Sequence, residues 1–203
     1  LDLRQISASG NGEPTRTAKR IFIVQREHVM KTTNHRGQAQ LFYKWMDSPL
    51  GKLKLVASDD GLAAILWERE RPRRVPLNIA AEDGNHPVLV ETERQLNEYF
   101  GGRRKSFALK LDFDGTSFQQ RVWRALLTIP FGETRSYGEI AKQIGNPTAT
   151  RAVGAANGRN PISIVAPCHR VIGSTGKLTG FGGGLDAKAY LLTLEGARVA
   201  QRD

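Results

Sequence analysis

In the first third of the chain, apolar residues recur at every second position, which is the period of a strand with one buried face. The pattern predicts three strands, over residues 41–46, 51–58 and 61–68, separated by short turns that contain Pro, Gly and Asp. Strands joined by such short turns pair antiparallel, so we expect a small meander. Residues 86–100 carry apolar positions at helical spacing and predict a helix over one face of this sheet. Alternation over residues 107–113 predicts one further extended segment.

The second half of the chain has the cap residues of several helices. Thr116 or Ser117 can cap a helix with one apolar face that closes before Pro130. A last helix is predicted over residues 185–195, with Glu195 in its final turn. The helix dipole disfavours a carboxylate at this end, so we expect Glu195 to have an arginine or histidine partner.

Two short helices joined by Gly-Asn-Pro predict a helix-turn-helix. Ser136 and Glu139 have the spacing of a capping box, and Asn146 is the predicted cap of the second helix, over residues 148–157. Apart from Arg151, the surface of this second helix is made of small residues: Ala149, Ala152, Val153, Gly154, Ala155 and Ala156. Such a helix can approach a groove closely and insert its arginine into a base stack. The alternatives are that the arginine contacts a phosphate, or that the small residues serve helix packing while the arginine is merely exposed.

These elements predict an α/β (α+β) fold with two domains. Residues 41–114 form a small antiparallel sheet with a covering helix, and residues 115–203 form a mainly helical domain with the helix-turn-helix and an active-site loop. Residues 1–40 are rich in polar residues and glycine, so we expect a disordered extension or a segment added in cloning. Met30 is a candidate natural start.

The net charge of +10 is unevenly distributed along the chain. Residues 115–203 contain eleven basic and five acidic residues, residues 1–40 contain seven and three, and residues 41–114 contain twelve of each. A basic excess in the C-terminal half indicates a polyanionic partner, DNA or RNA. Charge retained for solubility is the alternative explanation.

A single cysteine in 203 residues excludes an internal disulfide and any multi-cysteine zinc site, and it favours a reducing compartment. No apolar run approaches the roughly 20 residues of a membrane span, and no segment resembles a signal peptide. We therefore expect a cytoplasmic protein that needs no metal and no cofactor.

That cysteine, Cys168, is followed directly by His169 and Arg170. Positive neighbours stabilise a thiolate, so Cys168 is a candidate nucleophile, although free cysteine is also commonly buried and inert. If Glu195 pairs with His169, the three residues have the roles of nucleophile, base and orienting group in a triad. The glycine-rich stretch 173–184 predicts a pocket wall, with a flexible surface loop as the alternative.

The sequence Asn-Gly-Arg-Asn-Pro at 157–161, followed by Pro-Cys-His-Arg-Val at 167–171 and Leu-Glu-Gly at 194–196, resembles the O6-alkylguanine-DNA alkyltransferase family, the methylated-DNA–protein-cysteine methyltransferases. The bacterial constitutive type is the most similar. The resemblance runs from about residue 41 to residue 198.

The resemblance implies a role for each matching residue. Cys168 is the acceptor of the alkyl group, His169 removes its proton through a water molecule, and Glu195 orients His169. Asn160 braces the turn before the active-site loop. Tyr137 helps to rotate the target nucleotide and donates a proton to the leaving guanine.

The resemblance also implies a DNA interface and a base pocket. Arg151 fills the gap left by the flipped nucleotide, and the second helix of the helix-turn-helix lies in the minor groove. The residues expected to contact DNA are Tyr137, Asn146, Ala149, Arg151, Ala152 and Ser174. The residues expected to line the pocket are Val171, Phe181, Gly182 and Gly183.

The implied function is repair by direct transfer of an alkyl group from O6-alkylguanine in double-stranded DNA, once per molecule, with O4-methylthymine as a second candidate substrate. We expect a monomer. Two positions depart from the family pattern: Phe181 stands where many members have tyrosine, and Phe131 replaces a common cysteine. The four-cysteine, metal-dependent module of some relatives is missing from the sequence. A DNA lesion sensor that usually lacks the acceptor cysteine, and a cysteine hydrolase, are the alternatives.

Overall fold

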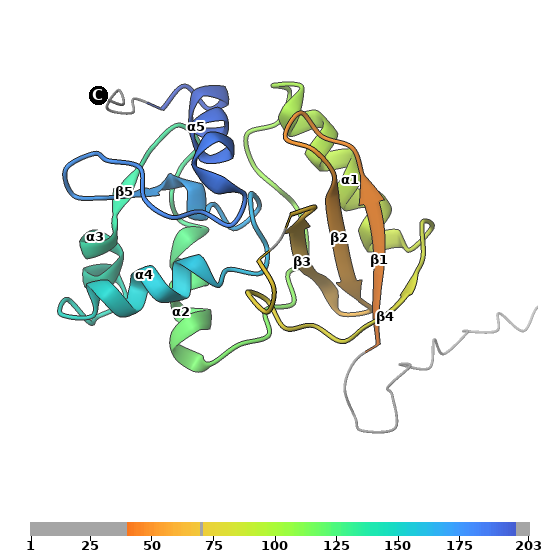
Figure 1. Cartoon of the computed structure of the whole chain (residues 1–203), viewed down its shortest axis with the longest axis horizontal. Coiled ribbons are helices and arrows are strands. Elements are labelled where there is room, and N and C mark those ends of the chain that lie inside the picture. Colours follow the sequence, from red (N-terminus) through yellow and green to blue (C-terminus); the bar gives the residue numbers. More distant parts are fainter. Residues whose placement is uncertain (1–39, 70, 198–203) are drawn as a thin grey trace, which may run out of the picture. The chain divides into compact units, whose positions relative to one another are not determined.

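The computed structural model describes residues 40–69 and 71–197, with Ala80 by its backbone alone. The expectations for residues 1–39 lie outside this range. The elements of the two halves are shown in Figure 1, where strands and a covering helix make up the N-terminal half and helices dominate the C-terminal half. The predicted fold class is confirmed.

The sheet has four strands, in the order β3-β2-β1-β4. The meander is confirmed: β1 (Leu41–Met46), β2 (Leu53–Ser58) and β3 (Gly61–Trp67) pair antiparallel. A fourth strand, β4 (Ile79–Glu82), pairs parallel with β1, so the sheet is mixed. The strand period does not predict β4, because its sequence Ile-Ala-Ala-Glu does not alternate apolar and polar positions.

The predicted helix over residues 86–100 is confirmed as α1 (Pro87–Phe100), which begins with proline at its first turn. It packs on one face of the sheet (Figure 1). The residues that it buries lie on one side of the helix: Leu89, Thr92, Gln95, Leu96 and Tyr99. The helical spacing of apolar residues therefore found part of the buried side, including Leu89, Leu96 and Tyr99, whereas the apolar Val90 is exposed.

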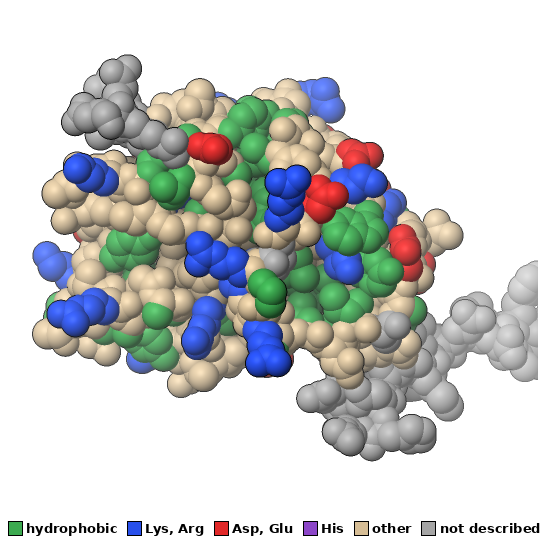
Figure 2. Space-filling view, viewed as in Figure 1, with side chains coloured by type: hydrophobic (Ala, Val, Ile, Leu, Met, Phe, Trp, Pro, Cys, Tyr) green, Lys and Arg blue, Asp and Glu red, His purple; other side chains and the backbone are tan. Residues whose placement is uncertain are grey.

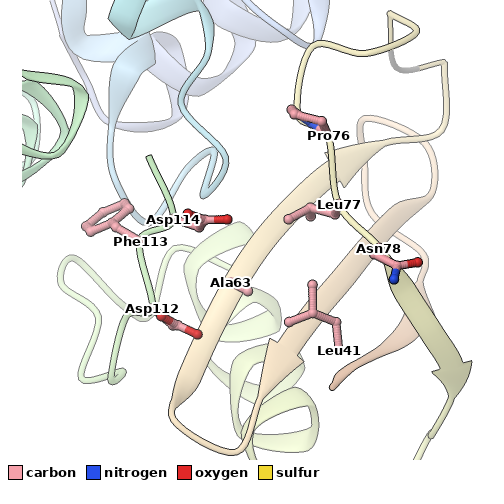
Figure 3. A pocket seen from close by; sticks show the side chains of 8 residues that line it. All are labelled: Leu41, Ala63, Pro76, Leu77, Asn78, Asp112, Phe113 and Asp114. Atoms are coloured by element: carbon pink, nitrogen blue, oxygen red, sulfur yellow. The ribbon is translucent and has the colours of Figure 1, made fainter. Parts of the chain in front are cut away.

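The other face of the sheet is covered more thinly. A cavity of about 580 Å³ opens there, between the sheet, the segment before β4 and the chain at 112–114 (Figure 3). Its lining residues are Leu41, Ala63, Pro76, Leu77, Asn78, Asp112, Phe113 and Asp114. None of them is a functional candidate from the sequence.

The segment 107–113 makes a single bridge, between Leu62 and Leu111, rather than a longer strand. The amide of Leu62 donates to the carbonyl of Lys110 (2.9 Å) and the amide of Asp112 donates to the carbonyl of Leu62 (2.8 Å). This close approach requires a glycine at position 61, because a Cβ there would lie 2.6 Å from the Lys110 carbonyl oxygen.

In the C-terminal half, α2 (Ser117–Leu126) and α3 (Tyr137–Gln143) both begin with a complete capping box. The predicted box of Ser136 and Glu139 is confirmed, and Thr116 caps α2 together with Gln119. The final helix is α5 (Gly184–Leu194), with Glu195 as its C-cap. Two short strands, β5 (Arg135–Ser136) and β6 (Val171–Ile172), pair parallel.

The second helix of the helix-turn-helix is α4 (Thr150–Gly158), and its predicted cap was wrong. Ala149 is the N-cap and no side chain caps the helix. Asn146 instead begins a turn in which its carbonyl accepts from the amide of Ala149 (3.0 Å). The helix therefore starts two residues later than expected.

None of the helices among the described residues combines the length and the apolarity that crossing a bilayer requires. On the face seen in Figure 2, Lys and Arg side chains predominate over the helical half, whereas most acidic side chains lie over the sheet half. This agrees with the charge distribution along the sequence.

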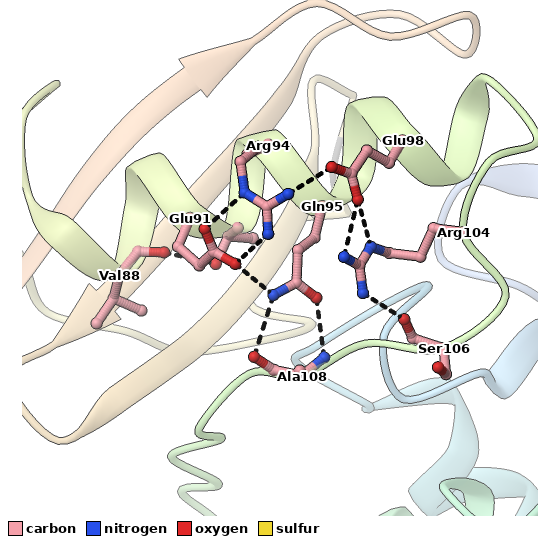
Figure 4. A network of polar contacts seen from close by, with 9 residues as sticks. Val88, Glu91, Arg94, Gln95, Glu98, Arg104, Ser106 and Ala108 are labelled. Atoms are coloured by element: carbon pink, nitrogen blue, oxygen red, sulfur yellow. Dashed lines mark hydrogen bonds and ion pairs between the residues drawn. The ribbon is translucent and has the colours of Figure 1, made fainter.

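The segment after α1 is tied back to that helix by polar contacts (Figure 4). The side-chain amide of Gln95, which is buried, donates to the carbonyl of Ala108 (3.0 Å) and accepts from its amide (2.9 Å). Nearby, Arg94 bridges Glu91 and Glu98 on the exposed side of the helix. The buried Gln95 side chain therefore links α1 to the segment after it through two hydrogen bonds.

We expect Gln95→Leu to lower the free energy of unfolding by roughly 2 kcal/mol, because two hydrogen bonds between α1 and the segment after it are lost. Urea unfolding followed by circular dichroism measures the change. Arg94→Gln is the control, since its ion pairs are exposed and contribute little. Equal losses in the two variants would contradict this role for Gln95.

Candidate active site

Cys168 opens a single 3-10 turn, Cys168–Arg170, directly after a buried loop. Asn160, which is fully buried, holds this loop from both sides. Its side-chain amide donates to the carbonyl of Ala166 (2.8 Å), and its side-chain oxygen accepts from the amide of Ile162 (3.1 Å). Within the loop, Ile164 has a φ of 72°, which is strained for a β-branched residue. The bracing position that the sequence suggested for Asn160 matches these contacts.

The thiol of Cys168 is buried, and burial raises its pKa. A hydrogen bond from Asn160 and the charges of Arg74 and Lys188 act in the opposite direction and do not offset burial. The expectation that His169 and Arg170 favour a resting thiolate is therefore wrong, because both side chains bind Glu195 instead. The thiol needs a base before it can react.

Glu195 lies at the centre of a buried cluster with both cationic neighbours. Its Oε1 lies 2.8 Å from Nε2 of His169, and Arg170 donates from Nε to Oε2 (2.7 Å) and from Nη2 to Oε1 (3.0 Å). Burial alone would raise the pKa of Glu195, but the hydrogen bonds from His169 and Arg170 prevail and lower the pKa to about 2. The predicted partner for this carboxylate is confirmed, and it is both histidine and arginine.

Burial lowers the pKa of His169, more than its contact with Glu195 raises it. The ring is thus neutral near pH 7. Because the anionic Glu195 only accepts hydrogen bonds, Nε2 carries the proton. Nδ1 is buried and has no hydrogen-bond partner among the described residues, which leaves its lone pair available as a base.

A cavity of about 480 Å³ lies between α4 and the glycine-rich loop. Tyr137, Arg151, Phe181 and Gly182 all contribute to its lining, so the structure brings these four candidates together. Tyr137 is half-buried, and its hydroxyl lies 2.9 Å from the hydroxyl of Thr179. Burial raises the pKa of Tyr137, and a negative charge on Cys168 would raise this pKa further.

The other pocket candidates lie outside this lining. Val171 is fully buried in β6 and pairs with Arg135 of β5. Gly183 lies against Trp67, and a Cβ there would lie 2.6 Å from the indole ring. Val171 and Gly183 therefore pack under the glycine-rich loop and do not line the cavity.

The candidates for DNA contact are distributed over the turn, α4 and the glycine-rich loop. Arg151, Ala152 and Ser174 are exposed, whereas Asn146 and Ala149 are half-buried. On α4, Val153, Ala156 and Asn157 face the interior, which leaves the small side chains of Ala152 and Ala155 on the outer surface. The bare outer surface inferred from the sequence is thus present.

Sequence reasoning missed four residues that contact the site. Three of them come from the N-terminal half. The ring of Trp67 packs edge-on against Phe181. Arg74 donates to the carbonyl of Asn160 (2.7 Å), and Tyr99 donates to Oε1 of Glu195 (2.7 Å). No local pattern links them to Cys168. The fourth is Lys188. Its position on the inner side of the last helix, among apolar residues, could have indicated a buried functional lysine.

Lys188 is fully buried, and burial lowers its pKa to about 8. Its ammonium group donates to the carbonyls of Val171 (2.5 Å) and Thr179 (2.8 Å). These bonds connect the strand after the cysteine to the loop that lines the cavity. Among the described residues, no group of three or more His, Cys, Asp or Glu side chains is placed to hold a metal ion.

Two family models match the chain, and together they cover most of the described residues. Residues 41–113 match the 6-O-methylguanine DNA methyltransferase, ribonuclease-like domain, and residues 117–197 match the 6-O-methylguanine DNA methyltransferase, DNA binding domain. The chain belongs to this family.

Individual relatives agree. A methylated-DNA–protein-cysteine methyltransferase from Methanosarcina acetivorans is 50% identical over 157 residues, which are 77% of this chain and 99% of the relative. One from Mycobacterium bovis is 52% identical over 161 residues, 78% of this chain and 94% of the relative. The crystal structure of Mycobacterium tuberculosis OGT in complex with DNA has a TM-score of 0.70 at 51% identity, covering 76% of this chain and 92% of that chain.

Glu195→Gln tests the electrostatics of the buried cluster. We expect the variant to lose roughly 3 kcal/mol of stability at pH 7, because Arg170 remains buried without its counter-charge. The pKa of Glu195 is lowered on folding, so its contribution is complete above about pH 4.5 and disappears as the pH falls toward 2.

Urea unfolding of both proteins between pH 7 and pH 2.5 measures this difference. The two stabilities converge at the acidic end of the range. A gap that stays constant with pH would contradict the low pKa.

Proposed function

We infer that this chain repairs DNA directly, by transferring an alkyl group, most simply methyl, from O6 of guanine to the sulfur of Cys168. One observation carries the inference: the sole cysteine of a chain in this family directly precedes His169, which pairs with the buried Glu195 and whose ring lies 6.3 Å from that of Phe181, in the lining of a cavity next to a helix-turn-helix. A nucleophile, a neutral base and a space beside a DNA-binding element are the parts that this reaction needs.

In the proposed reaction the thiol proton of Cys168 passes to Nδ1 of His169, through a bound water. The resulting imidazolium is stabilised by Glu195, at 2.8 Å from Nε2. The thiolate attacks the alkyl carbon, the S–C bond forms as the C–O bond breaks, and the electron pair leaves with guanine O6. A proton donated to the guanine, for which Tyr137 is the proposed source, gives the neutral base.

The product is an S-alkylcysteine, and a thioether is a poor leaving group. No group that we have identified among the described residues would remove the alkyl group, so we propose that each molecule reacts once. The transfer requires no cofactor in this scheme, because the protein itself is the acceptor.

A base within a duplex cannot reach a buried thiol, so the alkylated nucleotide has to be extruded. We propose that α4 enters the minor groove with its bare alanine surface, and that Arg151 occupies the vacated position in the stack. Asn146, Ala149, Ala152 and Ser174 are proposed as contacts to the DNA around it. Support comes from the position of Arg151, which is exposed at the rim of the cavity.

The extruded base is proposed to enter the cavity between Tyr137 and Phe181. Gly182 leaves room for the guanidinium of Arg74, another lining residue, because a Cβ at position 182 would lie 3.1 Å from Arg74 Cζ. Phe181 provides ring packing without a hydroxyl. O4-methylthymine as a second substrate, a monomeric state, a cytoplasmic location and a domain boundary at residue 115 stay predictions.

Two other functions were considered. A lesion sensor would bind the damaged DNA without reacting, which conflicts with an acceptor cysteine at position 168. A cysteine hydrolase would use the same cysteine and histidine but leaves the helix-turn-helix without a role. No observation in the structure favours either of them.

Mixing the chain with a duplex that carries O6-methylguanine, followed by intact-mass measurement, tests transfer. We expect one methyl group on the wild-type protein and none on Cys168→Ala, which still binds the duplex. Methylation of the Cys168→Ala variant, or an unmodified wild type that binds the duplex, would refute transfer to this cysteine.

Arg151→Ala tests base extrusion. We expect roughly tenfold slower transfer from a duplex, since nothing occupies the vacated stack, and a smaller effect on a single strand, where little stacking is lost. Lys110→Ala, an exposed change on the sheet half, is the control. Single-turnover rates on both substrates measure this, and equal losses on the two substrates would point to a simple phosphate contact.

A further inference from the structure

The N-terminal half contributes one polar side chain directly to the buried cluster of Glu195. Tyr99 lies in the last turn of α1 and is 1% exposed. Its hydroxyl donates to Oε1 of Glu195 (2.7 Å), across 96 positions of the sequence. This is the same oxygen that contacts His169 Nε2.

The ring of Tyr99 is held in place by aromatic neighbours. Its centroid lies 5.5 Å from that of Phe100, 5.4 Å from Phe107 and 6.3 Å from Phe131. Arg170, which also binds Glu195, lies over the ring of Phe131 at 5.8 Å. The hydroxyl of Tyr99 therefore reaches the carboxylate from a rigid support.

Tyr99 can act only as a donor in this contact. Burial raises the pKa of its hydroxyl, and the neighbouring carboxylate raises it further, so the proton stays on tyrosine at every physiological pH. Glu195 in turn is an anion and only accepts.

We propose that Tyr99 is a positioning residue for the alkyl-transfer site. By sharing Oε1 of Glu195 with His169, it sets how strongly the carboxylate binds His169 and stabilises a positive charge on its ring. This inference rests on the proposed function. Tyr99 touches neither the cysteine nor the substrate cavity, so it would act through Glu195 alone.

The physical reason is competition for one oxygen. Oε1 accepts from Tyr99, from His169 and from Nη2 of Arg170 (3.0 Å), while Oε2 accepts from Nε of Arg170 and from the amide of Gly132. Each donor partly neutralises the negative charge of the carboxylate. Without the hydroxyl, more of that charge acts on His169 and favours its protonated form, which cannot accept the thiol proton.

The other charged groups at the histidine come from two elements. Arg170 lies in the same turn and Lys188 lies in α5, and both lower the pKa of His169. Both keep their positive charge in a Tyr99 variant, and Lys188 makes no hydrogen bond to Glu195.

Tyr99→Phe in the full chain removes the hydroxyl and keeps the ring. The matched control is Tyr43→Phe, which removes a tyrosine–carboxylate hydrogen bond to Glu82 (3.3 Å) on the exposed sheet. We expect the His169 titration, followed by NMR on DNA-free protein, to move up by about half a unit in Tyr99→Phe and not in the control. The acid limb of the single-turnover transfer rate should move by the same interval.

A second change works in the opposite direction. Replacing Tyr99 with 3-fluorotyrosine keeps the hydroxyl and makes it a stronger donor, so the His169 titration should move down. This protein retains all hydrogen-bonding groups, and it serves as the test if Tyr99→Phe is too unstable to titrate.

A purely structural tyrosine gives a different result. The Tyr99→Phe variant would then unfold more easily while its His169 titration and acid limb match the wild type, and this outcome overturns the inference. A wild type that leaves the methylated duplex unchanged overturns the proposed function instead, and the NMR titration separates the two failures.

Discussion

The buried carboxylate of Glu195 is the group on which the arrangement of the site depends. An isolated charge in a protein interior is very costly, so the fold must supply donors to it. It does so with four residues from three segments: the 3-10 turn supplies His169 and Arg170, α1 supplies Tyr99, and the loop before β5 supplies the amide of Gly132. Because each donor requires its own element to be in place, the cluster links the histidine beside the cysteine to the rest of the molecule.

Because of this requirement, the sheet half contributes residues that hold the active site in place. β3 provides Trp67 beneath the glycine-rich loop, and the amide of Ile65 donates to the carbonyl of Pro161 (2.9 Å) just before the active-site turn. Arg74 caps the carbonyl of Asn160, and Tyr99 reaches Glu195. The N-terminal half thus packs against the loop that carries Cys168, while α4 and the cavity lie on the side that we propose meets DNA.

The cysteine illustrates why a sequence motif and its electrostatics have to be treated separately. Adjacent His169 and Arg170 suggested a thiolate, yet both side chains turn to Glu195, and burial raises the pKa of the thiol. A protonated resting thiol next to a neutral histidine fits a site that reacts only when its substrate is bound. It would also protect the sole cysteine from unwanted oxidation.

Short-range signals along the chain were enough to predict the local elements and the reacting residues. The period of apolar residues predicted the meander and α1, a cap residue followed by one apolar face predicted α2, and a capping box predicted α3. The Pro-Cys-His-Arg-Val motif identified Cys168. All of these signals lie within a few neighbouring residues. The fourth strand, the true start of α4 and the contacts of Trp67, Arg74 and Tyr99 became known from the folded molecule. Strand pairing, burial and long-range hydrogen bonds depend on which distant segments meet. A linear pattern contains no information on the distance between Tyr99 and Glu195, which are 96 positions apart and 2.7 Å from atom to atom.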